Sequence, residues 1–161
     1  MKSPAAIIRE LLIDQDLAEE SGDWRAFISF LPDQPNNAIC VYDTAGTPDG
    51  RMMGTGERIQ HLGIQIRVRG ENYSVTWDKV EAIVEALDAA GGSVVAFDSA
   101  EAYLVHNVSR TGTVMPLGVE EQGSRRLHNF TINAITTLFE TDDAATPYNT
   151  ADWRPYWVQN E

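Results

Sequence analysis

The stretch at residues 57–70 predicts the central strand of the fold, because apolar side chains alternate one by one with glycine or polar residues from Leu62 to Arg69. Four aliphatic residues alternate here with glycine and polar residues, in the order Leu62, Gly63, Ile64, Gln65, Ile66, Arg67, Val68 and Arg69. A period of two places the two sets on opposite faces of a strand. We therefore expect one face to belong to the core and the other to be open to water or to a partner.

Two stretches carry the three-to-four-residue spacing of amphipathic helices. The first is expected over residues 4–19, with Ser3 as its cap and Pro4 at its first position. The second is expected over residues 74–90, where an apolar side stands opposite an acidic one and Gly91 follows. No hairpin turn flanks the second helix, so we expect it to cross the sheet.

Short β-rich runs predict the other strands. They lie at residues 26–31, 38–42, 93–97, 102–110 and 125–139. The first two are separated by a proline-rich turn, which favours a hairpin between them. Residues 111–124 are expected to be an irregular connection. The pattern is that of an α/β (α+β) domain.

The glycine-rich stretch at residues 43–56 is expected to be a loop, and such a long loop is uncommon unless it is functional. It ends in Arg51, Met52 and Met53 before two further glycines. Adjacent methionines need an apolar environment, which either the core of this chain or a neighbouring subunit could provide. The loop leads into a strand and lacks the Gly-Lys-Ser/Thr of a phosphate-binding loop.

The composition changes at residue 140, so we expect residues 1–139 to form one domain and residues 140–161 an acidic C-terminal arm. The arm is interrupted by prolines but contains four large aromatic residues, Tyr148, Trp153, Tyr156 and Trp157. A disordered acidic tail would not normally hold so many. The arm could pack on its own domain or on a neighbouring subunit, and the aromatic residues favour the second alternative.

Charge and length exclude several classes of function. The 161 residues carry a net charge of −12, which argues against binding to nucleic acid and to anionic membranes. No apolar run approaches the roughly 20 residues that cross a bilayer. Charges interrupt the apolar N-terminal stretch, so it does not resemble a signal peptide, and synthesis in the cytosol is expected.

The sequence shows no catalytic, cofactor-binding or metal-binding constellation. Three histidines, His61, His106 and His128, fall on different predicted strands without ligand spacing. The single cysteine, Cys40, excludes an internal disulfide and is expected to be a buried apolar residue. Four arginines, Arg67, Arg69, Arg125 and Arg126, could form a basic band that pairs with acids of this chain or of a neighbour. No enzymatic activity is predicted.

Three segments together resemble one family. They are residues 32–46 (PDQPNNAICVYDTAG), residues 64–70 (IQIRVRG) with the helix after them, and residues 115–136 (MPLGVEEQGSRRLHNFTINAIT). In this order and spacing they resemble the bacteriophage minor capsid and tail-completion proteins, which include the tail terminators of long-tailed phages. The resemblance spans about residues 26–139.

The resemblance implies a mostly antiparallel sheet with helices on one face. It also implies a structural virion protein that forms a ring, usually of six subunits, at the head-proximal end of the tail tube. There the ring would stop tube growth and join the tail to the head and neck, and DNA would pass through its lumen without specific binding. It implies no catalytic residue and no cofactor.

Two other functions remain open at this stage. The chain could be a head-side minor capsid or connector protein. It could also be a small ligand-binding α/β module, although the sequence shows no convergent polar groups for a ligand. Ring closure needs two different surface patches that meet head to tail, and the methionine loop and the aromatic arm are candidates for one of them.

Overall fold

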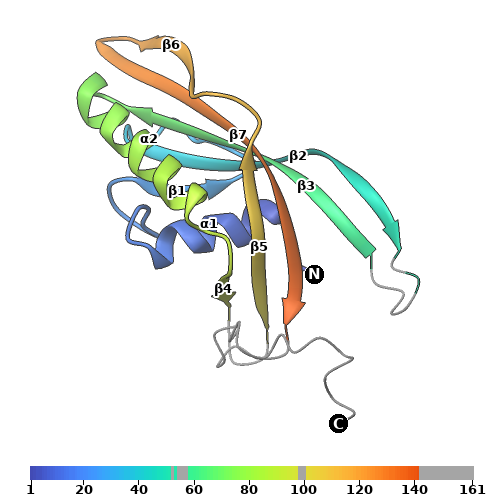
Figure 1. Cartoon of the computed structure of the whole chain (residues 1–161). Helices are drawn as coiled ribbons and strands as arrows, with labels where there is room; N and C mark the ends of the chain where they lie inside the picture. The colour runs from blue at the N-terminus through green and yellow to red at the C-terminus, as the bar shows by residue number, and fades with distance from the viewer. Residues whose placement is uncertain (52, 54–57, 98–100, 142–161) are drawn as a thin grey trace.

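A computed structural model describes residues 1–51, 53, 58–97 and 101–141, in which two helices cover one face of a seven-stranded sheet (Figure 1). The helices are α1 (Pro4–Asp14) and α2 (Tyr73–Asp88). The strands are β1 (Arg25–Ile28), β2 (Ala38–Arg51), β3 (Arg58–Gly70), β4 (Ser93–Ala96), β5 (Ala102–Arg110), β6 (Met115–Gln122) and β7 (Arg125–Thr141). The α+β prediction is confirmed.

The sheet is built around its two long neighbours, β3 and β7. The strand order is β1-β2-β3-β7-β5-β4, and β6 pairs with the first part of β7. β1 and β2 run parallel, whereas the other pairs are antiparallel. β3 is therefore a central strand, as the alternation predicts.

The alternation on β3 separates the core from the opposite face of the sheet. Ile64, Ile66 and Val68 are at most 1% exposed and belong to the apolar cluster that includes the buried sides of both helices. Phe130 and Ile132 of β7 join the same cluster. The face that holds these residues is the helix-covered face, and burying it is the main apolar contribution to stability.

Helix α1 is shorter than the sequence predicts. Its cap is as expected, since the Ser3 hydroxyl accepts a hydrogen bond from the Ala6 amide at 3.2 Å. The helix ends at Asp14, and the amides of Leu17 and Ala18 both return to the Leu12 carbonyl at 2.9 and 3.2 Å. These hydrogen bonds satisfy the Leu12 carbonyl oxygen at the end of the helix. The chain leaves the helical conformation there, before residue 19.

Helix α2 agrees with its prediction to within two residues at each end. The Asn72 side chain accepts a hydrogen bond from the Val75 amide at 3.2 Å and caps the first turn. Its buried side holds Val80, Ile83 and Leu87, which pack over β3, β7 and β5. The helix thus crosses the sheet, as expected from the absence of a flanking hairpin turn.

The predicted hairpin of the first two strands is wrong. β1 and β2 are parallel neighbours, with Arg25 paired to Ala38 and Ile28 to Val41. The proline-rich segment 29–37 therefore has to bring the chain back to the start of β1 before β2 begins. β1 is only four residues long, so this short segment suffices without a crossover helix.

The two predicted irregular stretches are also wrong in large part. Residues 43–51 continue β2, and the hairpin of β2 and β3 extends well beyond the helices (Figure 1). Residues 115–122 form β6. The ladders contain register shifts between Thr44 and Thr47 and between Pro116 and Gly118. Such bulges accommodate glycine and proline within strands.

Neither of the helices in the described part of the chain has the length and apolar character needed to cross a lipid bilayer.

Candidate functional site

The face of the sheet opposite the helices is polar, and we call it the helix-free face. It is formed by alternate residues of three strands, Cys40 and Tyr42 of β2, Gln65, Arg67 and Arg69 of β3, and Asn129, Thr131 and Asn133 of β7. Gln65 Nε2 donates a hydrogen bond to Asn133 Oδ1 at 2.9 Å, and Arg67 Nε donates to Asn129 Oδ1 at 3.1 Å. Neighbouring strands are thus joined by side chains as well as by the backbone.

Arg69 fixes the segment 29–37 on this face. Its Nη2 donates hydrogen bonds to the carbonyl oxygens of Pro32 and Pro35 at 2.6 and 2.8 Å, and its Nε donates to that of Asn36 at 3.4 Å. The residue is 2% exposed, and burial lowers the pKa of its guanidinium. Arg125 Nη1 adds a hydrogen bond to Asn36 Oδ1 at 2.5 Å.

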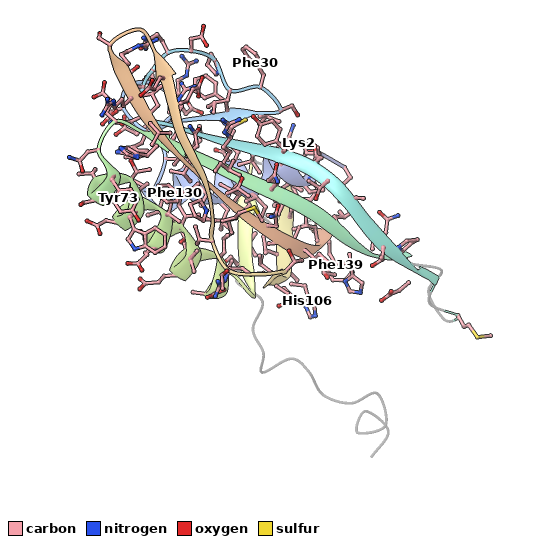
Figure 2. The ribbon with its side chains drawn as sticks, turned by 90° about the horizontal axis from the view of Figure 1, so that it is seen from above. Lys2, Phe30, Tyr73, His106, Phe130 and Phe139 are labelled. Atoms are coloured by element: carbon pink, nitrogen blue, oxygen red, sulfur yellow. The ribbon has the colours of Figure 1, made fainter. Side chains whose placement is uncertain are left out.

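The fixed segment begins with a tight turn that directs Phe30 outwards. Ser29 has a φ of 59°, and the Phe30 amide donates to the Ile28 carbonyl at 2.7 Å, which closes a three-residue γ-turn. Positive φ is rare for a residue that has a Cβ, and it stores strain. The turn leaves Phe30 69% exposed and Ile28 39% exposed. Figure 2 shows Phe30 and the α2 residue Tyr73 at widely separated places, with Phe30 near the blue N-terminal part of the chain and Tyr73 on the green helix.

Cys40 and Tyr42 lie side by side near this turn. Burial raises the pKa of the Cys40 thiol, against weaker opposing effects of its hydrogen bonds to Tyr42 and to the Phe30 backbone. Burial, together with the hydrogen bond to Cys40, raises the pKa of Tyr42 to about 12. Cys40 is buried, as predicted, and its raised pKa keeps it in the unreactive thiol form at neutral pH.

These two groups predict a loss of stability at alkaline pH. In the unfolded chain they lose their protons near their ordinary pKa values, about 8.5 for cysteine and 10 for tyrosine. In the folded chain the Cys40 thiol and the Tyr42 hydroxyl keep their protons to higher pH. The free energy of unfolding should therefore fall as the pH rises from about 9 to 12. Urea unfolding across this range measures the fall, and the Tyr42→Phe variant should show a smaller one. An equal fall in both proteins would contradict this assignment.

The β2–β3 hairpin carries one of the predicted methionines at its end. Met53 is fully exposed, at 105% of the reference area. Lower on the hairpin, His61 Nε2 lies 2.6 Å from Asp49 Oδ2, and its Nδ1 lies 2.8 Å from the Thr137 hydroxyl. The alternative in which Met53 folds back on the core is therefore wrong for this subunit. Met52 lies outside the described residues.

Strand β6 exposes a second set of apolar side chains. Met115, Leu117 and Val119 are each about half exposed, at 51%, 49% and 51%. Glu120 of the same strand approaches Arg67 to 4.0 Å, and Glu121 approaches Arg126 to 3.5 Å. Met115 pairs with Thr131 on the helix-free face, whereas Val119 pairs with His128 on the other face, because the register shifts between Pro116 and Gly118. These exposed residues were not predicted, because residues 111–124 were expected to be irregular.

The histidines do not converge. His128 packs edge to face against Tyr73 with ring centroids 5.5 Å apart, and His106 does so against Phe139 at 5.8 Å. Among the described residues, no group of three His, Cys, Asp or Glu side chains could hold a metal ion.

The sequence matches the family of bacteriophage tail terminator proteins over residues 11–137. The chain belongs to the bacteriophage tail terminator family. The match includes all three segments on which the resemblance rests. A comparison with curated proteins gives no match.

Family membership settles the general role. Tail terminator proteins are structural, non-enzymatic components of the virion, located in the tail. They terminate the phage tail and join it to the head, in contact with tail-tube and head-side proteins. The reading as a small ligand-binding module is therefore wrong.

The structure places the predicted contact residues of this tail terminator in different settings. Arg51 is the last residue of β2, and Arg126 is exposed beside Glu121. Arg67 and Arg125 are half buried on the helix-free face, and Arg69 is buried beneath its own loop. The aromatic residues Tyr148, Trp153, Tyr156 and Trp157 lie outside the described residues. Phe30 was not predicted as a contact residue, although an aromatic residue beside a proline-rich turn can indicate an exposed contact.

Proposed function

We propose that this tail terminator closes into a ring, of six copies, at the head-proximal end of the tail tube. There it stops addition of tube subunits and provides the surface on which the head and neck proteins dock. The family match carries this proposal, and the exposed apolar residues of the subunit support it. Phe30, Met53, Met115 and Leu117 have water-exposed surfaces that a partner would cover.

The contacts of the ring are proposed to come from the hairpin, the arginines and the C-terminal arm. Arg51 is the last residue of β2, Met53 follows at the end of the hairpin, and Met52, which lies outside the described residues, is proposed to act with them. Arg67, Arg125 and Arg126 can pair with acids of a neighbour, whereas Arg69 acts by holding the segment 29–37. Residues 1–139 form the ring body, and the arm at residues 140–161 anchors to the next copy through Tyr148, Trp153, Tyr156 and Trp157.

The acidic composition suits a passage for DNA. A basic lumen would bind the phosphates and hold the DNA, whereas carboxylates repel them. Part of the net charge of −12 is therefore proposed to line the lumen. The protein would be made in the host cytoplasm and would reach the neck of the virion by assembly.

The mass of the protein in solution, alone and with isolated tail tubes, tests this proposal. We expect the full chain to form a species of about six times 17.8 kDa, alone or on tube ends. A chain that ends at Glu140 should assemble less well. A full-length control in which Tyr148, Trp153, Tyr156 and Trp157 are replaced by serine separates the aromatic side chains from the length of the arm. A full chain that remains monomeric and ignores tube ends would overturn the ring.

A further inference from the structure

The two sides of the subunit differ in charge. Helices α1 and α2 together contain six carboxylates and two cations. The exposed side of α2 presents Asp78, Glu81 and Glu85, which recur at helical spacing and form one acidic stripe. The helix-covered side of the subunit is therefore strongly acidic.

The helix-free face is basic, although the chain as a whole is acidic. It holds Arg67, Arg69 and Arg125, and the acids that act on them are Glu120 of β6 and Asp33 of the segment 29–37. Arg25 of β1 lies on the same face. It pairs with Ala38 of β2, and Ala38 is two residues from Cys40 on that strand, so all three side chains point to one side. Arg25 is exposed, and its guanidinium lies 5.1 Å from the centre of the Phe27 ring.

Each side also presents exposed apolar residues. On the helix-free side Phe30 is 69% exposed at a turn that is strained at Ser29 and held by Arg69. On the helix side Tyr73 and Val75, in the first turn of α2, are 55% and 51% exposed. Backbone strain persists only where the surroundings enforce it, and it is concentrated at functional positions. A rigidly held, exposed aromatic residue is the kind of anchor that dominates binding at interfaces.

We infer that the α2 side of one copy docks on the helix-free face of the next copy. This contact rests on the proposed ring and specifies its surfaces. The acidic stripe of α2 meets Arg25 and Arg67, and the apolar residues at the start of α2 contact Phe30. The occupant is a second copy of this chain because the two surfaces are complementary in charge and both present apolar anchors.

This arrangement also satisfies the symmetry of a ring. A head-to-tail contact joins two different patches of identical subunits, and it can be repeated until the ring closes. The two patches lie on opposite sides of the sheet, because α2 packs on the face of β3 that holds Ile66 and Val68, whereas Arg67 belongs to the other face. A contact between opposite sides leaves the first copy with a free helix-free face and the second copy with a free α2 side, so a third copy can bind at either end. A two-fold dimer would instead place like charges against each other.

Two variants that each damage one surface test the inference. Variant A carries Arg25→Glu and Phe30→Asp on the helix-free face, and variant B carries Glu81→Lys and Glu85→Lys on α2. These residues are exposed, and circular dichroism checks that both variants fold. The control carries Asp14→Lys and Glu20→Lys, which change the charge by the same amount as variant B at exposed residues outside both surfaces. Mass is measured under the condition, alone or with tubes, in which the wild type assembles.

We expect each variant alone to remain monomeric and the control to assemble. An equal mixture of A and B should form dimers of twice 17.8 kDa and nothing larger, because only the α2 side of A and the helix-free face of B are intact. A mixture that stays monomeric, or a variant that assembles by itself, overturns the contact and leaves the ring standing. A wild type that is monomeric in both conditions overturns the ring and this contact together.

Discussion

Replacing Arg69 with methionine is expected to lower the free energy of unfolding by about 3 kcal/mol, the scale found when one member of a buried charged group is removed. Methionine retains the apolar stem but donates no hydrogen bond. The carbonyl oxygens of Pro32, Pro35 and Asn36 then lose the guanidinium that holds them. The segment 29–37 should loosen, and Phe30 should lose its fixed position.

Chemical unfolding of the full chain measures the loss, and protease cleavage after Phe30 reports the loosened segment. Arg110→Met is the matched control. Arg110 forms a two-point ion pair with Asp88 at 2.9 and 3.0 Å, but it lies on the surface, where water screens such pairs and they contribute little to stability. If both variants lost equal stability, Arg69 would not have the structural role described.

Replacing Gly63 with alanine is expected to destabilise the protein by about 2–3 kcal/mol, the upper part of the range for overpacked sites. A Cβ at this position would overlap the carbonyl oxygen of Ala45 and the hydroxyl of Thr44. The overlap falls on the backbone of β2 at the register shift after Thr44, so no side-chain rotation relieves it. The β2–β3 hairpin would have to separate there.

The control for this substitution is Gly112→Ala, because a Cβ at Gly112 meets nothing within 4 Å. Thermal unfolding of both variants gives the comparison, and tube binding by the Gly63→Ala protein shows whether the hairpin is needed for assembly. A Gly63→Ala protein as stable as the Gly112→Ala protein would show that β2 tolerates a side chain at this crossing.

Alternation along strands and three-to-four-residue spacing along helices predicted the elements that have one buried side and one polar side. β3 and β7 have one apolar and one polar side along most of their length, and α2 has a buried stripe, so their boundaries were found within about two residues. The hydrophobic effect acts directly on such patterns, because a shift by one residue would expose the core side of a strand.

Sequence patterns did not predict the parallel pairing of β1 and β2 or the existence of β6. Proline and glycine at Pro116 and Gly118 suggested a loop, but a bulge at that point places them within the ladder. Proline-rich turn chemistry at residues 29–37 suggested a hairpin, whereas a buried arginine from a distant strand holds the segment. Local propensity does not contain such tertiary contacts.

The candidate contact surface was predicted in part. The sequence singled out Met53 but left open whether it packs on the core, and of the four arginines expected to form a basic band three lie on one face of the sheet. The burial of Arg69 and the exposure of Phe30 did not follow from composition. Arg69 is buried by the segment 29–37 to which it donates hydrogen bonds, and Phe30 is exposed by the γ-turn at Ser29, whose positive φ has no sequence signature in a non-glycine residue.

The position of β7 has a consequence for how the protein is made. It joins β3 on one side to β5 and β6 on the other, although it comes after all of them in the chain. Pairs such as His61 with Thr137 link distant parts of the sequence, and such non-local pairing slows folding. A nascent chain that still lacks β7 would expose two open strand edges, those of β3 and β5. Such edges recruit other chains, so premature termination or slow synthesis before residue 125 should lead to aggregates rather than to a partly folded subunit.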